Sequence, residues 1–368
     1  MHSDRLRRLQ HLLDDGGWAA AAVMPGPNLF YLTGLSFHLM ERPVVGIFPV
    51  QGVPRLIVPG LDREKAAISP LELELVDYGE DTASRADAFR RGLADLLPAS
   101  SRVAIEPLRL RFFEQSLIRT AAPGWSLDSG EAVFRALRVR KDPAEVAAMR
   151  RAIETAQTAL EATIPLLRIG MTEREMATAL TLELYRAGSD PEMPFAPIVA
   201  SGPHSSMPHA IPSDRRLQAG DLLLFDWGAA CDGYFSDLTR TFAVGDVEPE
   251  LVKIHAVVAQ ANAAGRAAAG PGISCAAVDA AARAVIEAAG YGPSFIHRTG
   301  HGLGLEAHEP PDIRGDNDAR LEPGMTFTVE PGIYLPGRGG VRIEDNVLIT
   351  DSGAETLSDA PRGLRRVG

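Results

Sequence analysis

The chain has 368 residues, of which 45% are hydrophobic and 23% are charged, and this is the composition of an ordinary globular protein of about two domains. A net charge of -11 argues against nucleic acid or an anionic membrane as the main partner. Two cysteines, Cys231 and Cys275, are too few for a disulfide framework. Because no segment has signal-peptide or membrane-spanning character, we expect a cytoplasmic protein.

Residues 1–128 alternate helical and extended patterns, which predicts an α/β domain. This part contains neither a Gly-rich phosphate loop nor a metal-ligand spacing, and we interpret His38 as a loop residue. Helices are expected at 5–13, 84–97 and 109–120, and strands at 18–24, 44–50, 55–58, 71–78, 103–105 and 125–127.

Residues 129–368 form the second predicted domain, in which two pairs of helices are each followed by strands. Asp142-Pro143 has the residues of a helix start, an N-cap followed by proline. Helices are expected at 144–167, 172–187, 249–268 and 275–289. The repeated order of helix, helix and strands predicts an α+β domain with an internal duplication.

The stretch 222–242 predicts a β-hairpin that carries two aspartates. Asp232-Gly233 is a strong turn signal, and a turn there pairs Asp226 with Thr239. Because strand side chains alternate, Asp237 then lies on the same face as Asp226. Two carboxylates on an apolar face need a cation between them. The alternative is that both are exposed or paired with Arg240.

A second hairpin is predicted around Gly337 or Arg338, and it places Glu330 and Glu344 on one face. Between the hairpins lies His301, flanked on both sides by glycine. Four carboxylates and one imidazole make an oxygen-rich ligand set suited to Mn, Co or Zn. Four acids exceed what one divalent ion needs, so a two-metal site is predicted.

In this order the five residues resemble the ligand set of the pita-bread metallopeptidases, which include methionine aminopeptidase, prolidase, aminopeptidase P and creatinase. The resemblance is densest over 195–241 and 297–344. The N-terminal part is similar to the creatinase-like domain of the prolidase and aminopeptidase P branch. The resemblance implies a creatinase-like α/β domain at 1–128 and a pita-bread catalytic domain at 129–368.

The resemblance also implies roles for these residues. Asp226 would bind one metal ion, His301 and Glu330 the other, and Asp237 and Glu344 would bridge the two. Manganese is the first expectation, with cobalt and zinc also compatible. The ions would lower the pKa of a shared water, and Glu330 would act as general base and acid.

Substrate contacts are implied in the same way. His209 and His308 match the two histidines that contact substrate and stabilise the oxyanion. Arg342 shares a strand face with Glu344 and would orient that residue or a substrate carbonyl. Phe195 and Tyr334, with the ring of His308, would line a pocket for proline, unless the two aromatic residues belong to the core.

Three neighbouring residues receive simpler interpretations. His297 is four residues before His301, but the intervening glycine argues against a helix, so we expect it to be a hydrogen-bonded neighbour. His204 is interpreted as a loop residue near the entrance. Thr239, opposite Asp226, is either a plain strand former or a hydrogen-bond donor to the ligand set.

The expected activity is cleavage of the bond between an N-terminal residue and proline. Prolidases similar to this chain often carry arginine four residues after the position of His308, where this chain has Asp312. An acid there would repel a dipeptide's carboxylate, which favours an Xaa-Pro aminopeptidase over the alternative, an Xaa-Pro dipeptidase. More remote alternatives are a metal-independent creatinase-like hydrolase and an inactive binding homologue. Proline-containing peptides are the expected partners, and a homodimer is expected by resemblance.

Overall fold

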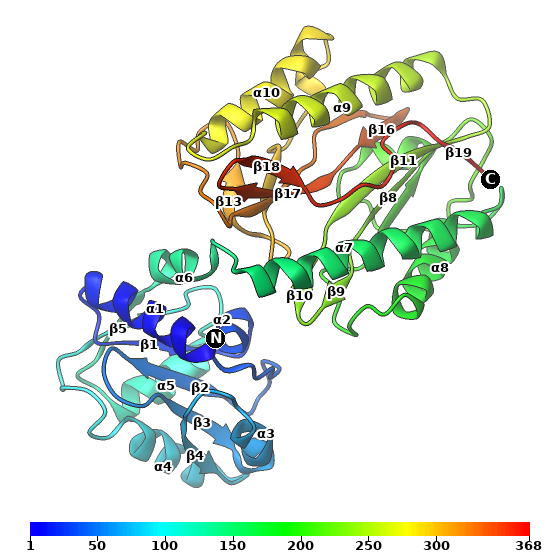
Figure 1. Cartoon of the computed structure of the whole chain (residues 1–368). Coiled ribbons are helices and arrows are strands. Elements are labelled where there is room, and N and C mark those ends of the chain that lie inside the picture. The colour runs from blue at the N-terminus through cyan, green and yellow to red at the C-terminus, as the bar shows by residue number, and fades with distance from the viewer. The chain divides into compact units, whose positions relative to one another are not determined.

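The computed structural model describes residues 1–368, which divide into two compact units, Met1–Arg138 and Val139–Gly368 (Figure 1). Helix α6 (Glu131–Arg138) packs against α1 (His2–Asp15) and therefore falls in the first unit, whereas the sequence placed the boundary after residue 128. None of the helices combines the length and the apolar character that crossing a membrane requires.

The first unit is built on a six-stranded mixed sheet in the order β4-β3-β2-β1-β5-β6. Its central strand β1 is buried along its whole length. The expected hairpin of β2 and β3 forms, with Val45 opposite Ile57. The strands are β1 (Ala20–Val23), β2 (Val45–Pro49), β3 (Arg55–Pro59), β4 (Glu74–Tyr78), β5 (Arg102–Ile105) and β6 (Ser126–Ser129), and the other helices are α2 (Pro27–Thr33), η1 (Gly60–Asp62), α3 (Arg63–Ala67), α4 (Thr82–Leu93) and α5 (Phe112–Ala121).

Two helix pairs enclose the strands of the second unit, one on each side (Figure 1). The first pair is α7 (Pro143–Thr163) and α8 (Glu173–Arg186), and the second is α9 (Pro249–Ala268) and α10 (Cys275–Ala288). The predicted start of α7 is confirmed by a capping box. The Asp142 carboxylate accepts a hydrogen bond from the backbone N–H of Glu145, and the Glu145 carboxylate accepts one from the backbone N–H of Asp142.

The strands form a four-stranded sheet, β19-β11-β8-β7, and a five-stranded sheet, β13-β12-β14-β17-β18, with two short hairpins beside them. Apart from the C-terminal strand β19, the strands of each sheet follow one helix pair, which confirms the predicted repeat. Their bounds are β7 (Ile198–Ser201), β8 (Leu222–Trp227), β9 (Ala230–Cys231), β10 (Tyr234–Phe235), β11 (Leu238–Val244), β12 (Gly300–Gly302), β13 (Glu309–Ile313), β14 (Thr326–Val329), β15 (Gly332–Leu335), β16 (Gly339–Arg342), β17 (Asp345–Thr350), β18 (Gly353–Thr356) and β19 (Arg366–Val367), with 3-10 turns η2 (Ile164–Leu166), η3 (Gly202–Ser206) and η4 (Gly292–Ser294).

The core under α7 and α8 determines which way the functional face of β8 points. Phe225 and Trp227 are buried in this core, and the indole of Trp227 donates to the carbonyl of Ala156 at 2.8 Å. Because side chains alternate along a strand, Asp226 must face the opposite side. That side is where the second half of the unit contributes its own strands.

Candidate metal centre

The first hairpin has the predicted register. Asp226 lies opposite Thr239 in the pairing of β8 with β11. The turn residues Asp232 and Gly233 have φ of 52° and 78°, as a two-residue hairpin turn of the primed type requires. Asp237, one residue before β11, is buried and lies close enough to Asp226 for the two charges to repel.

The second hairpin brings the two glutamates to the same place. Val329 lies opposite Asp345, and the β15–β16 pair continues in the same register to a turn at Gly337, whose φ is 76°. Glu330 and Glu344 therefore lie opposite each other, on one face as predicted. The backbone N–H of Glu344 donates to the carbonyl of Thr239 at 3.1 Å, which joins the two hairpins.

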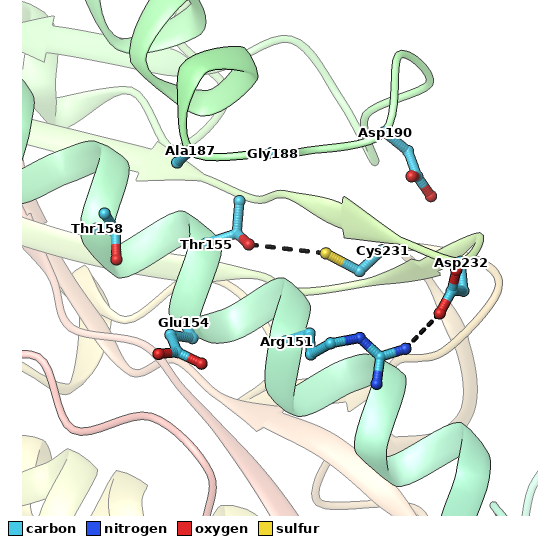
Figure 2. Close-up of a pocket in the computed structure, with 9 residues that line it drawn as sticks. All are labelled: Arg151, Glu154, Thr155, Thr158, Ala187, Gly188, Asp190, Cys231 and Asp232. Atoms are coloured by element: carbon cyan, nitrogen blue, oxygen red, sulfur yellow. Dashed lines mark hydrogen bonds and ion pairs between the residues drawn. The ribbon is translucent and has the colours of Figure 1, made fainter.

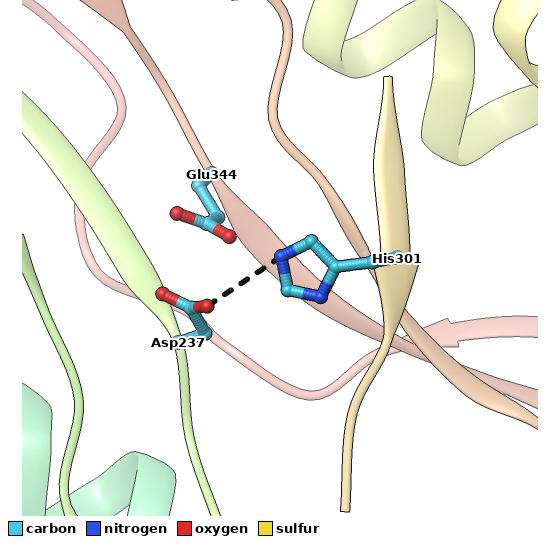
Figure 3. A group of neighbouring side chains, drawn as sticks. All are labelled: Asp237, His301 and Glu344. Carbon is cyan, nitrogen blue, oxygen red and sulfur yellow. Dashed lines mark ion pairs between the residues drawn. The ribbon is translucent and has the colours of Figure 1, made fainter. Parts of the chain in front are cut away.

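His301 enters from the short strand β12, and its glycine neighbours explain how. A side chain at Gly300 would place Cβ 1.8 Å from the carbonyl oxygen of Thr328, and one at Gly302 would place it 2.1 Å from that of Pro310. Only glycine lets β12 lie this close to both neighbours. Figure 3 shows the outcome, with the imidazole pointing between Asp237 and Glu344.

The five predicted ligands form one cluster. Ligand atoms of Asp237, His301 and Glu344 lie within 4.8 Å of one another. His301 Nε2 is 3.7 Å from Asp237 Oδ2 and 3.3 Å from Glu330 Oε1. Asp226 completes the group, because its charge acts on both Asp237 and Glu344.

The electrostatics of the cluster favour added positive charge. Burial, followed by repulsion from the neighbouring acids, raises the pKa of Asp237 and Glu344 well above the usual range, and burial also raises that of Asp226. Burial acts in the same direction on Glu330, but the hydrogen bond and charge of His301 lower its pKa to about 2. Asp226 Oδ1 and Glu344 Oε1 are buried without a hydrogen-bond partner. Such oxygens fit divalent cations as ligands.

Arg342 is the one arginine inside the cluster. Its guanidinium donates to Asp226 Oδ2 at 2.5 Å, to the Tyr334 hydroxyl at 2.8 Å and to Thr239 Oγ1 at 3.0 Å. It thus orients Asp226, whereas the sequence had assigned it to Glu344 or a substrate carbonyl. The Thr239 hydroxyl in turn donates to Glu344 Oε2 at 2.7 Å, so Thr239 is a hydrogen-bond donor to a predicted ligand, as expected, but that ligand is Glu344 and not Asp226.

Arg240 does not pair with the aspartates of the cluster. It forms a buried ion pair with Asp345 at 2.8 Å. The alternative of a simple Asp–Arg240 pair is therefore wrong. Asn346, which the sequence analysis missed, exchanges two hydrogen bonds with the backbone of Asp237, accepting at 3.2 Å and donating at 2.6 Å. Asn346 is two residues after the predicted ligand Glu344, and this spacing was the sequence feature that could have identified it.

Three further histidines surround the cluster. The ring of His308 lies 4.0 Å from that of His301, centre to centre. His297 shares a hydrogen bond with the Tyr334 hydroxyl at 2.9 Å, which confirms its role as a hydrogen-bonded neighbour. His209 is exposed, and its charge lowers the pKa of both His297 and His308, which places it beside them.

The two aromatic candidates differ in position. Tyr334 is buried, and its hydroxyl is held by Arg342 and His297. Phe195 is partly exposed in the segment before β7 and forms no aromatic pair. Only Tyr334 is thus tied to the cluster by contacts.

Two buried carboxylates outside the cluster were not expected from the sequence. Glu309, next to His308, forms an ion pair with Lys141 at 2.5 Å, and both side chains are almost completely buried. Glu173 binds His204 at 2.7 Å, so His204 is half of a carboxylate–histidine pair and not a free loop residue. The two members of each pair are far apart in the sequence, so no local sequence pattern could have predicted either pair.

The environment of Asp312 differs from the one assumed from the sequence. Its carboxylate is paired with the guanidinium of Arg298, and the two side chains are 25% and 32% exposed. Asp312 lies opposite His301 in the β12–β13 pairing. The charge of Arg298 also lowers the pKa of His308. The expected negative surface is therefore neutralised, and a partly exposed cation lies beside a candidate substrate residue.

A separate hollow of about 470 Å³ lies on the outside of the unit (Figure 2). The Cys231 thiol at its wall is 3.7 Å from the Thr155 hydroxyl, and burial raises the pKa of that thiol. Its lining contains none of the clustered acids and histidines and consists of Arg151, Glu154, Thr155, Thr158, Ala187, Gly188, Asp190, Cys231 and Asp232.

The fold and the acidic cluster together define a metallopeptidase with a creatinase-type N-terminal domain. The sequence model of Metallopeptidase family M24 matches residues 147–351, and that of the Creatinase/Prolidase N-terminal domain matches residues 5–140. The chain belongs to metallopeptidase family M24, in the branch that contains prolidases and aminopeptidase P.

The relatives resemble the chain along its whole length. A putative dipeptidase of Bacillus subtilis, YkvY, is 35% identical over 98% of this chain and 99% of its own. The solved prolidase of Thermococcus sibiricus has a TM-score of 0.94 and 34% identity, covering 100% of this chain and 99% of that one. A dipeptidase structure from Pyrococcus horikoshii OT3 has a TM-score of 0.92 and 38% identity, covering 99% and 100%.

Proposed function

We propose that this metallopeptidase is an Xaa-Pro dipeptidase that uses two divalent metal ions. The names of the relatives, prolidase and dipeptidase, support this activity better than the aminopeptidase activity that the sequence favoured. The argument against a dipeptidase was the negative charge of Asp312. Since Arg298 neutralises that charge, Asp312 would not repel the carboxylate of a dipeptide.

The donor set fits the proposed metal ions. Asp226, Asp237, His301, Glu330 and Glu344 would hold them, and the oxygen-rich mixture suits manganese. When bound, the ions would supply Lewis-acid polarisation of the scissile carbonyl and activation of water.

The remaining steps belong to side chains of this chain. Glu330, kept ionised by His301, would accept a proton from water and pass it to the leaving nitrogen of proline. Burial lowers the pKa of His308 to about 4, so its imidazole is neutral at pH 7 and would donate an N–H to the substrate. His209, which lies beside His308, would make a similar contact with the substrate.

The position of Arg298 is the observation that most favours a dipeptide as the substrate. A dipeptidase needs a cation beside the second residue, because the substrate's own carboxylate is at that point. Arg298 is one-third exposed, is held by Asp312 and lies close to His308. A guanidinium oriented in this way would bind the carboxylate of proline, whereas a longer peptide would present only an amide there.

The test compares Ala-Pro with Ala-Pro amide in wild type, Arg298→Ala and Arg298→Lys. We expect Arg298→Ala to lower kcat/KM for Ala-Pro by at least about tenfold, roughly 1.4 kcal/mol, and to leave hydrolysis of the amide nearly unchanged. Arg298→Lys should recover part of the loss. Arg314→Ala is the matched control, since Arg314 pairs with Asp316 nearby. Equal losses on both substrates would contradict the assignment.

A further inference from the structure

The first residue of α8, Glu173, has an unusual number of hydrogen bonds for one carboxylate. Its side chain is completely buried and lies outside the metal-ligand cluster. Five donors bind it: Ser201 N at 2.7 Å, Ser201 Oγ at 2.9 Å, His204 Nδ1 at 2.7 Å, Ser213 N at 3.0 Å and Ser213 Oγ at 2.7 Å. Both carboxylate oxygens are thus fully used.

These donors lie on both sides of His209 in the chain. Ser201 and His204 precede His209, and Ser213 follows it. The single carboxylate of Glu173 therefore closes residues 201–213 into a loop that carries His209. His209 itself is exposed and its ring makes no hydrogen bond, so the backbone of this loop sets the position of the ring.

Two further hydrogen bonds attach the middle of the same loop to β16, the strand of Arg342. The backbone N–H of Gly340 donates to Ser205 Oγ at 2.9 Å, and Arg342 donates to the carbonyl of Pro208 at 3.4 Å. Pro208 is the residue before His209. The loop is thus held at its ends by Glu173. Near its tip it is held by β16, whose Arg342 also donates to Asp226.

The charge of Glu173 is necessary for this arrangement. Burial raises its pKa, but the hydrogen bonds from Ser213, Ser201 and His204 outweigh that effect and leave the pKa below its usual value. An ionised carboxylate accepts at both oxygens. An amide would direct an NH₂ group at donors on one side and lose up to three of the five bonds.

We propose that Glu173 is a positioning residue of the active site, which fixes the loop 201–213 so that His209 reaches the substrate. The inference rests on the proposed contact between His209 and the substrate. Glu173 acts only through His209, so its contribution should disappear when the imidazole is absent. A residue that merely stabilised the fold would lower activity whether or not His209 is present.

The experiment is a double-mutant cycle on the metal-loaded, full-length enzyme with Ala-Pro as substrate. We expect Glu173→Gln to lower kcat about tenfold with little change in KM or metal content. Combined with His209→Ala it should cause no further loss, whereas combined with His308→Ala it should cause its full loss. Glu175→Gln is the matched control, because Glu175 is exposed in the same helical turn and serves only the α8 cap.

Hydrogen exchange of the loop gives a readout that is independent of activity. Peptides covering 202–213 should exchange faster in Glu173→Gln and remain unchanged in Glu175→Gln. His204→Ala, which removes one donor, should show a smaller effect and serves if Glu173→Gln folds poorly. Unchanged loop exchange, or an equal loss of rate in the His209→Ala background, would overturn the proposal. A wild-type rate in His209→Ala alone would instead contradict the proposed function of that histidine.

Discussion

At the scale of single residues, the cluster is defined by a conflict between charge and burial. Asp237 and Glu344 are buried beside Asp226 and Glu330, and the arginine that forms an ion pair within the cluster is Arg342, with Asp226. Removing charges from water is costly unless they are paired, so an arrangement like this is maintained for binding and not for stability. Asp226 Oδ1 and Glu344 Oε1 show the same effect, because both oxygens are buried without a hydrogen-bond partner.

The first prediction follows from that conflict. Asp237→Asn or Glu344→Gln should reduce the bound metal below two ions per chain and lower kcat/KM by at least about 10³-fold. Because each change removes a buried charge, the midpoint of thermal unfolding of the metal-free protein should stay constant or rise. Metal analysis, Ala-Pro hydrolysis and calorimetry test this. Two bound ions with near-wild-type turnover in either variant would refute the dinuclear site.

At the scale of elements, the position of His301 depends on β12 lying against its neighbours. Gly300→Ala would place a Cβ 1.8 Å from the carbonyl oxygen of Thr328, so β12 must move and carry His301 with it. We expect weaker metal binding, measured by isothermal titration, and a loss of about 2 kcal/mol or more in the free energy of unfolding.

Gly270→Ala provides the control for this prediction. A Cβ there has no neighbour nearer than 3.8 Å, the side chain of Ile273, so metal binding and stability should stay close to wild type. If Gly300→Ala also behaved like wild type, the close approach of β12 would not be what positions His301.

The hairpins show how much of the site the sequence could predict. Strand periodicity and the Asp232-Gly233 turn were sufficient to pair Asp226 with Thr239, and an even spacing was sufficient to place Glu330 and Glu344 on one face. These relations are local within each hairpin, and backbone geometry enforces them.

Side-chain partners were less predictable, because they come from distant segments. Thr239 serves Glu344, 105 residues away, and Glu173 binds His204, 31 residues away. The charge of Asp312 was misjudged for a related reason, since its neutralising partner Arg298 belongs to the adjacent strand segment. The register within one hairpin does not determine which of its side chains will contact a residue of another hairpin.

At the scale of the whole molecule, the two halves of the catalytic unit divide the work. The half built on α7 and α8 supplies the two aspartates and the His209 loop, and the half built on α9 and α10 supplies His301, His308 and the two glutamates. The site forms only when the strands of both halves meet, as the bond between Glu344 and Thr239 illustrates. Under the proposed function, Arg298 would then determine the length of peptide that fits.

The most direct test of this account is substrate length, measured as kcat/KM for Ala-Pro and Ala-Pro-Ala with manganese at one pH. The account predicts that Ala-Pro is cleaved at least about tenfold more efficiently, because its carboxylate meets Arg298, and that a chelator abolishes both activities until metal is restored. Equal or faster cleavage of Ala-Pro-Ala would contradict the dipeptidase assignment, and activity that survives complete metal removal would contradict the metal centre itself.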